Sequence, residues 1–536
     1  MCYNKIGEFM KKKNNIVCIV SILIVAFVAM LPMFMTSYKS SHDTKFHLAN
    51  IVSITENIKN TGLPGKIVGN IANDFGYGTN LFYPPLAHNS IAYLNAVINN
   101  PIISIEIFYY IILALSGITM FFLAKKVSKS WEIGLVSATI YMLFPYHISN
   151  IYIRDAQNEA LLFVFLPMII SGLYDLYKNK NKSFYILFTI GYIGGMLSHL
   201  TLMVYFTVLI LVLMIINFKE TIKRIKPLII SSLFILMITS PFLIPLLEQN
   251  ILGNYRVFQN GVMVQGTWGH ALSIFDYLNS MTTLKSGNIK YFIDIITLLL
   301  LIITLVKYKK LNNKFYNSIL IFGIISLILS TKLFPWDILP KSIRIMQFPW
   351  RFETFVALSI SLIAPLCMML MKDKRVLAFS LTVLILLLIQ STLNPATNEE
   401  IRLDNVEYFY GLGSQEEYLP VNLYENKDYY ETRSHDILLV NGNGVITDVY
   451  NESSKLEFKF EGDGVVELPR IYYIGYTLKD GNNKIKLYEN DKGFIEAKLN
   501  SGTYSLEYEG TNLYKASIYI SIISIIGLGV FVWKRK

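Results

Sequence analysis

The sequence predicts a polytopic α-helical membrane protein with about twelve transmembrane helices. Only 16% of its 536 residues are charged and 53% are hydrophobic, whereas a soluble chain carries about 25% charged residues. The charges lie in short clusters between long apolar runs, as expected where a charge at the bilayer centre costs at least ~2.5 kcal/mol. Strand-like alternation is confined to the C-terminal quarter, which predicts an extracytoplasmic antiparallel β-sandwich or jelly-roll-like domain before the last helix.

Apolar runs long enough to cross a bilayer occur at about twelve places. The fifth and sixth runs are separated only by residues 198–200. One continuous helix through both would hold about 36 residues, far more than a bilayer needs, so we predict two helices. The predicted spans are residues 16–35, 102–123, 131–144, 156–177, 184–197, 201–218, 227–247, 291–308, 315–331, 353–371, 376–391 and 514–533.

Lys and Arg residues gather in every second connection, which is how cytoplasmic loops differ from outer loops. This pattern predicts a multi-pass protein of the plasma membrane with both termini in the cytoplasm. It also explains the net charge of +10 without a nucleic-acid partner. The first apolar run is longer than the core of a signal peptide, so we expect it to be retained. The basic segments are residues 1–15, 125–129, 178–182, 219–226, 307–314, 372–375 and 534–536.

Three parts are expected. A transmembrane part covers residues 1–392 and includes a large first outside loop at 36–101, a β-rich domain covers 393–513, and a last helix with a basic tail covers 514–536. The β-rich domain contains no cysteine, so packing alone must hold it. Two roles stay open for it: binding carbohydrate, or capping the membrane part. Its clearest strand patterns are at residues 456–460, 485–487, 495–499 and 504–508.

The first outside loop begins with an acid, an imidazole and an amide at helical spacing. In a helix, Asp43, His47 and Asn50 fall on one stripe. They would present polar groups for chemistry above an apolar support. The alternative is that Asp43 is a helix N-cap and His47 a solvated neighbour.

A second candidate group opens the fourth predicted span. Arg154 is followed by Asp155 and Glu159, which would lie one turn apart on the same helix face. Asp155 is also easily explained as an acid that interacts with the helix dipole. Glu159 lies further into an apolar run, where ionisable groups are usually functional. His199, between the fifth and sixth spans, either joins the site or caps a helix.

A third group precedes the tenth predicted span. Arg344, Gln347, Trp350 and Arg351 combine guanidinium groups with an aromatic surface at the membrane boundary. That combination is typical of the ordinary interfacial belt. It is also what a lipid-linked phosphate needs, because a guanidinium group binds phosphate through two donors.

Several of these motifs together resemble one bacterial membrane protein family, labelled "6-pyruvoyl-tetrahydropterin synthase related". The resemblance spans roughly residues 36–510, and the family is similar in layout to the GT-C glycosyltransferases. One departure is Asp155, which stands where the family pattern has Gly after the Arg. The motifs are His42-Asp43-x-x-Phe46-His47, Tyr83-Pro84-Pro85-Leu86, Arg154 with Glu159, Gln347-Phe348-Pro349-Trp350-Arg351 and Glu417-Tyr418-Leu419-Pro420.

The resemblance implies a GT-C-like fold and a site built on acids of the outside loops. It assigns catalytic roles to Asp43 and, less directly, to Asp155 and Glu159, and it adds Tyr83 to the substrate-binding residues. The pterin label is not supported by the sequence, which shows no motif for that reaction.

The resulting hypothesis is a glycosyltransferase that takes a sugar from a polyprenyl-phosphate donor and passes it to a cell-envelope glycan. Asp43 would be the general base and Arg344 or Arg351 would hold the leaving phosphate. A divalent cation, Mg²⁺ or Mn²⁺, on Asp43 with Asp155 or Glu159 is a further option. The alternatives are a flippase for lipid-linked sugars, and a non-catalytic scaffold whose β domain binds glycan or a partner.

Overall fold

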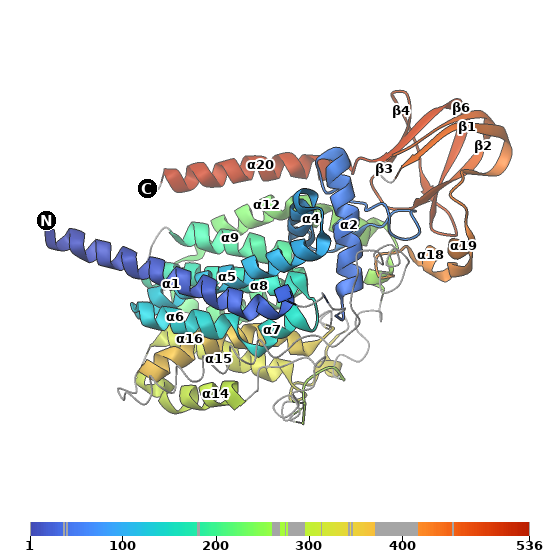
Figure 1. Cartoon of the computed structure of the whole chain (residues 1–536). Coiled ribbons are helices and arrows are strands. Elements are labelled where there is room, and N and C mark those ends of the chain that lie inside the picture. The colour runs from blue at the N-terminus through green and yellow to red at the C-terminus, as the bar shows by residue number, and fades with distance from the viewer. Residues whose placement is uncertain are drawn as a thin grey trace.

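The structure is a computed structural model that describes residues 2–35, 38, 41–179, 183–259, 269–273, 275–276, 295–311, 313–340, 344, 347–369, 416–452 and 455–534. A bundle of apolar helices forms its membrane part (Figure 1). Its helices are α1 (Cys2–Met35), α5 (Pro101–Ser128), α6 (Trp131–Met142), α7 (Pro145–Tyr152), α8 (Gln157–Tyr174), α9 (Ser183–Ser198), α10 (Leu200–Ile216), α11 (Phe218–Ile222), α12 (Ile225–Leu252), α14 (Ile295–Lys307), α15 (Lys314–Ser330), α16 (Glu353–Met369) and α20 (Asn512–Trp533).

Short helical turns connect these helices. They are η1 (Asp175–Asn179), η2 (Arg256–Phe258), η3 (Tyr308–Leu311), η4 (Trp336–Ile338) and η6 (Pro349–Phe352). Six helical segments among the described residues have the length and composition to cross a membrane by themselves, and α9, α10 and α15 are shorter apolar helices. The helices differ in burial: α16 is almost wholly buried, whereas α20 is mostly exposed. An apolar helix exposed at the edge of a bundle is what lipid contact requires.

Eleven of the twelve predicted spans coincide with helices. The break predicted at residues 198–200 is present, because α9 ends at Ser198 and α10 begins at Leu200. His199 occupies the N-cap of α10, and its Nδ1 accepts a hydrogen bond from the backbone N–H of Leu202 at 3.3 Å. The span predicted at 376–391 lies outside the described residues, so the number twelve stays a prediction.

The basic connections gather at one end of the bundle. Lys126 forms an ion pair with Asp175 at 2.7 Å, and the Nε of Arg224 donates to the backbone carbonyl of Leu176 at 2.9 Å. The hydroxyl of Tyr316 donates to the carbonyl of Val127 at 3.2 Å. The start of α1 and the end of α20 also lie at this end (Figure 1). We call it the lysine-rich end; its assignment to the cytoplasm stays a prediction.

The first outside loop folds into helices over the opposite end. These are α2 (Thr44–Thr61), α3 (Thr79–Phe82) and α4 (Leu86–Ile98). Helix α2 ends where Gly62 adopts a left-handed conformation with φ 79° and returns a hydrogen bond to Ile58, a conformation that favours glycine. Helices α2 and α4 pack together, and the side chain of Asn95 donates to the Thr55 hydroxyl at 3.0 Å.

The C-terminal region contains an antiparallel sheet, as predicted, and two short helices that were not predicted. The sheet order is β1-β2-β6-β3-β4, and β5 pairs with β6. The predicted strands at 495–499 and 504–508 are two parts of one long strand, β6. The elements are α18 (Val421–Glu425), α19 (Lys427–Thr432), β1 (Leu438–Glu452), β2 (Lys455–Ile471), β3 (Tyr476–Asp480), β4 (Asn483–Ile485), β5 (Tyr488–Glu489) and β6 (Phe494–Tyr508).

The described strands form one sheet, whereas a sandwich or jelly roll has two. The pairing of β2 with β6 shifts register between Phe460 and Asp463, and again between Leu468 and Ile471. Such irregularities bend a strand and increase its twist. Alternate residues of the long strands, such as Phe458 and Leu506, then bury one face of the sheet in a common core.

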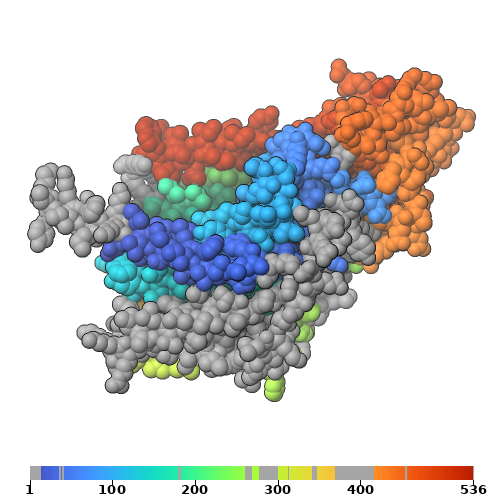
Figure 2. Space-filling model, in the orientation of Figure 1, coloured from blue at the N-terminus to red at the C-terminus, as the bar shows by residue number. Residues whose placement is uncertain are grey.

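The sheet domain packs directly against the first outside loop (Figure 2). A shared core joins Phe75 and Tyr77 of the loop to Tyr473 and Phe494 of the domain. The amide of Gln249, at the end of α12, exchanges hydrogen bonds of 2.7 and 3.2 Å with the backbone of Ile474. These contacts hold the domain above the end of the bundle that lies opposite the lysine-rich end.

A buried ion pair anchors α19 to the sheet. The Nε of Arg433 lies 2.6 Å from Oε1 of Glu467, and both side chains are almost fully buried. Tyr429 and Asn490 also donate to Glu467, at 2.8 and 2.7 Å. Three side chains therefore depend on one carboxylate.

Arg433→Met should lower the stability of this region by about 3–5 kcal/mol, because it leaves a buried carboxylate without its countercharge. The measurement is the thermal unfolding midpoint of the purified full chain in detergent. Arg433→Met combined with Glu467→Gln should recover most of the loss. An unfolding midpoint for the double variant as low as that of the single variant would contradict this explanation.

Candidate active site

Glu159 is the centre of an ion-pair cluster at the start of α8. Its Oε2 lies 2.8 Å from Nη1 of Arg154 and 3.5 Å from Nε of Arg351. The hydroxyl of Tyr146 donates to its Oε1 at 2.6 Å, and Thr354 approaches the same oxygen at 3.4 Å. Burying a charge away from water is costly unless partners satisfy it, and this carboxylate has partners on three separate elements.

Helix α7 holds Arg154 in place. The Nη1 of Arg154 donates to Oδ1 of Asn150 at 2.8 Å and to the Tyr146 hydroxyl at 3.0 Å. Burial alone would lower the pKa of Arg154, but the charge of Glu159 together with Tyr146 and Asp43 raises it overall. Arg154 is therefore a fixed positive charge under the site.

Asp43 is attached to this cluster through its backbone. Its N–H donates to the carbonyl of Arg154 at 3.0 Å, and the N–H of His42 donates to Ile153 at 3.3 Å. Asp43 occupies the N-cap position of α2, as the alternative interpretation predicted, but its side chain makes no capping hydrogen bond. Among the described residues, no hydrogen bond or ion pair engages this half-buried carboxylate.

Tyr83 and Glu417 stand next to Asp43. Burial raises the pKa of Tyr83, and the charge of Asp43 raises it further. Burial also raises the pKa of Glu417 to about 7, and Asp43 is the neighbouring charge that adds most to this shift. A nearby negative charge disfavours ionisation of a carboxyl group, so the charge of Asp43 helps Glu417 to keep its proton.

An aromatic surface adjoins Arg351. The rings of Phe348 and Trp350 are stacked, with centroids 4.6 Å apart, and His270 meets both edge-on at 5.1 and 5.6 Å. The guanidinium of Arg351 lies 5.0 Å from the Phe348 ring centroid. A charged group and a flat apolar wall are thus side by side at the end of the bundle.

His47 and Asn50 lie behind Asp43, in the packing between the outer helices. The Nδ1 of His47 is 2.6 Å from Nε2 of His88, and burial lowers the pKa of His47 to about 3. The Oδ1 of Asn50 accepts a hydrogen bond from Thr79 at 2.5 Å. The predicted stripe exists, but His47 and Asn50 are buried and support the site from behind.

The structure corrects the prediction that Asp155 and Glu159 share one helix face. Helix α8 begins at Gln157, and Asp155 precedes it in a left-handed conformation with φ 55°. Its carboxylate accepts hydrogen bonds from Tyr38 at 3.0 Å and from Tyr109 at 2.5 Å. This reversal of the chain turns Asp155 away from the Glu159 cluster.

The remaining predicted residues separate into two groups. His199 is half-buried and close enough to feel the charges of Arg351 and Glu159. Arg344 instead pairs with Asp337 at 3.0 Å, and Gln347, with φ 65°, shapes the loop that leads to Arg351. The structure therefore gathers Asp43, Tyr83, Arg154, Glu159, His199, Trp350 and Arg351 at one end of the bundle.

Two of the three acids proposed as metal ligands already have other partners. Glu159 already faces two arginines, and Asp155 is bound by two phenol groups. Within the described ranges, no group of three or more His, Cys, Asp or Glu side chains has the geometry to hold a metal ion. We derive no catalytic step through a metal.

Sequence reasoning missed several residues of this arrangement. Tyr146 and His88 belong to no recognisable sequence motif. Their roles are visible only in their contacts with Glu159 and His47. His270 lies far along the chain from Trp350. Glu417 belongs to the Glu-Tyr-Leu-Pro motif, which was a usable signal, but its position beside Asp43 depends on the tertiary fold.

Three comparisons place these observations among known proteins. A model of the family described as "6-pyruvoyl-tetrahydropterin synthase related domain; membrane protein" matches residues 81–397. This stretch is more than half of the chain, and it contains Tyr83, Arg154, Glu159 and Arg351. Asp43 and Glu417 lie outside it.

One relative is a protein of Lactococcus lactis subsp. cremoris (strain MG1363) described as uncharacterized. It is 25% identical over 346 residues, which are 61% of this chain and 55% of that protein. The chain thus spans about half the length of this relative. Among solved structures, the arabinofuranosyltransferase AftD from mycobacteria is similar with a TM-score of 0.46 and 15% identity, covering 69% of this chain and 26% of AftD.

Asp155→Asn should leave the protein folded and cost about 1–2 kcal/mol, because Asn tolerates the left-handed conformation but keeps only one of two acceptor oxygens for Tyr38 and Tyr109. Asp155→Ala should cost more, because it removes both acceptors and strains the backbone. The measurement is the thermal unfolding midpoint of each variant. Equal midpoints for Asp155→Ala and the unaltered protein would show that Asp155 is not a structural residue.

Proposed function

The chain belongs to the 6-pyruvoyl-tetrahydropterin synthase related family of membrane proteins, and we propose that it is a membrane glycosyltransferase. In the proposed reaction, a sugar passes from a polyprenyl-phosphate donor to a hydroxyl group of a cell-envelope glycan on the outer side of the plasma membrane. One observation carries the proposal. A half-buried carboxylate, Asp43, is unengaged among the described residues and stands beside a cluster of fixed guanidinium groups.

Asp43 is suited to act as the general base. A base must accept a proton at a defined position, and the backbone hydrogen bond to Arg154 fixes this one. The neighbouring acid Glu159 is not available for the task, because Arg154 and Arg351 already neutralise it. Its role is to orient those two arginines.

Arg351 is suited to hold the phosphate of the donor. Its side chain is 15% exposed, whereas that of Arg154 is 6% exposed, so Arg351 is the guanidinium that a ligand reaches. A guanidinium group binds phosphate oxygens through paired donors. The Phe348 and Trp350 rings beside it offer an apolar surface for the isoprenoid chain.

The chemical step is one displacement at the anomeric carbon. The acceptor oxygen forms a bond to that carbon while the bond to the phosphate oxygen breaks, and polyprenyl phosphate leaves with the electron pair. Asp43 takes the proton of the acceptor hydroxyl. Arg351 stabilises the negative charge that develops on the leaving phosphate.

Asp43→Asn should lower the turnover number about 10²- to 10⁴-fold, the range for loss of a general base, with little change in the unfolding midpoint. The assay is release of polyprenyl phosphate from synthetic polyprenyl-phosphate sugars by the full chain in proteoliposomes. Glu56→Gln is the matched control: it removes a carboxylate from the same helix, α2, where Glu56 is bound by Asn70.

Three outcomes would contradict parts of this proposal. An unchanged release rate in Asp43→Asn would show that Asp43 is not the general base. Movement of an intact lipid-linked sugar across the proteoliposome membrane without cleavage would favour the flippase. Loss of activity in Glu56→Gln equal to that in Asp43→Asn would show that the effect is not specific to the site.

Ionisation of Glu417 should lower the activity at alkaline pH. Its pKa is raised to about 7, first by burial and then by the charge of Asp43. Above that pH its ionised form adds a negative charge near the incoming phosphate. We expect kcat/KM to fall as pH rises through about 7, and Glu417→Gln to remove this fall. An alkaline decline that persists in Glu417→Gln would assign it to another group.

The same raised pKa has a consequence for stability. In the unfolded chain Glu417 has its ordinary pKa of 4.5, whereas in the folded protein its pKa is about 7. Between these two pH values the folded protein keeps a proton on Glu417 that the unfolded chain has lost. This group therefore makes the folded state less stable as pH rises through that window. The slope of the unfolding midpoint against pH should flatten there in Glu417→Gln.

A further inference from the structure

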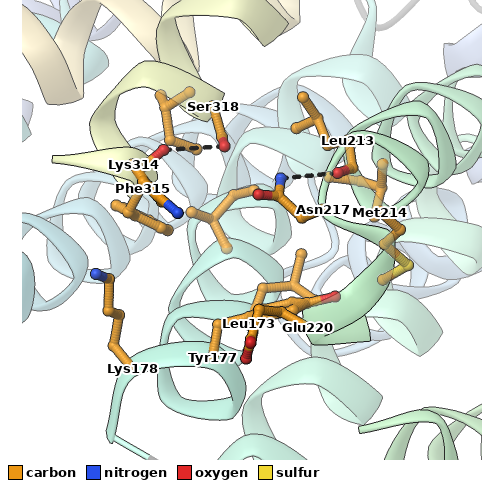
Figure 3. Close-up of a pocket in the computed structure, with 13 residues that line it drawn as sticks. Leu173, Tyr177, Lys178, Leu213, Met214, Asn217, Glu220, Lys314, Phe315 and Ser318 are labelled. Atoms are coloured by element: carbon orange, nitrogen blue, oxygen red, sulfur yellow. Dashed lines mark hydrogen bonds between the residues drawn. The ribbon is translucent and has the colours of Figure 1, made fainter. Parts of the chain in front are cut away.

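A second cavity lies at the lysine-rich end of the bundle, far from the site of Asp43. It has a volume of about 340 Å³ and opens between η1 at the end of α8, the end of α10 and the start of α15. Its inner wall is apolar and includes Ile170, Leu173 and Leu213. Lys178 and Lys314 stand at its rim (Figure 3).

The rim of this cavity is positively charged. The side chains of Lys178 and Lys314 are exposed, and neither has an ion pair with any residue that the structure describes. The acid at the rim, Glu220, is already paired with Lys223 at 2.8 Å and with Arg224 at 2.7 Å. Two lysines with no opposing carboxylate favour an anion and disfavour a ligand that carries its own positive charge.

The position of the cavity indicates where its ligand comes from. Helix α10, which forms one wall, exposes Leu211, Ile215 and Ile216 near the same end. Exposed apolar residues on a bundle helix face lipid tails. The lysines lie at the ends of the helices, where basic side chains meet lipid head groups. A soluble anion would gain nothing from the apolar wall, whereas a lipid uses both parts.

We propose that this cavity binds one anionic phospholipid of the bilayer, of the phosphatidylglycerol type. Lys178 and Lys314 hold its phosphate, and an acyl chain lies against the wall formed by Ile170, Leu173 and Leu213. Zwitterionic phospholipids fit less well, because their amine would meet two lysines and no uncompensated acid. Basic pockets between transmembrane helices bind anionic head groups in this way.

The bound lipid would link three helices at this end. Its head group bridges Lys178, which follows α8, and Lys314, which begins α15. Its tail fills the space between α8 and α10. The site uses none of the residues placed around Asp43, so its test is independent of sugar transfer.

The experiment measures lipid retained by the full chain. The protein is purified in detergent, phosphatidylglycerol or phosphatidylcholine is added, and the bound lipid is counted by native mass spectrometry. One phosphatidylglycerol should bind in preference to phosphatidylcholine. Lys178→Gln combined with Lys314→Gln should weaken phosphatidylglycerol binding roughly tenfold or more, because each lysine near a head group contributes measurably.

The matched control is Lys219→Gln combined with Lys226→Gln. Both lysines are exposed at the same end of the bundle, and neither lines the cavity, so phosphatidylglycerol binding should be retained. A second variant, Ser318→Trp, fills the cavity without changing charge and should also expel the lipid. Ser318 lies on the rim, one turn after Lys314 (Figure 3).

Three results would overturn the proposal. Equal loss of phosphatidylglycerol in both lysine pairs would show only general attraction of anionic lipid to a basic surface. Unchanged binding in the Lys178/Lys314 variant or in Ser318→Trp would remove the cavity from the interaction. Retention of polyprenyl phosphate in place of any phospholipid would assign the cavity to a different lipid.

Discussion

The buried carboxylate of Glu159, shared by Arg154 and Arg351, is the interaction on which the candidate site depends. A carboxylate this deeply buried is tolerated only with countercharges at hydrogen-bond distance. Arg154 supplies a hydrogen-bonded countercharge at 2.8 Å, and Arg351 adds a second positive charge at 3.5 Å from a different segment. The requirement fixes where α16 begins relative to α8, because Arg351 lies in the turn just before α16. Such a pair adds little to stability by itself, so its effect is to define one arrangement of these helices.

A backbone hydrogen bond connects this ion-pair cluster to Asp43 and fixes its position. The carbonyl of Arg154 accepts the N–H of Asp43, so the residue whose guanidinium satisfies Glu159 also holds the start of α2. The acid is thereby positioned without being consumed by an ion pair. Behind it, the His47–His88 contact at 2.6 Å is buried and fixes the side of α2 that faces α4. Glu159 is thus neutralised by arginines, whereas the carboxylate of Asp43, the proposed general base, is not.

The sequence predicts the parts of this protein that depend on local patterns. The apolar runs and the break before Leu200 follow from spacing of a few residues. The orientation of Asp155 does not, because it depends on a left-handed residue that no periodicity reveals. Glu417 reaches Asp43 from the other end of the chain, through the packing of Phe75 and Tyr77 against the sheet domain. Contacts between residues so far apart in the sequence can be identified only in the folded structure.

The Glu159 cluster and the cavity rim use different cations for a physical reason. Arginine is always charged and donates through a planar fork, so it suits the buried cluster around Glu159. Lysine is strongly hydrated on a flexible stem, so it suits the exposed rim formed by Lys178 and Lys314. A lipid head group that remains partly in water can be held by the second kind of cation. A sugar phosphate that must lose its leaving group in a defined direction needs the first. The proposed sugar-transfer site therefore relies on Arg, and the proposed lipid cavity relies on Lys.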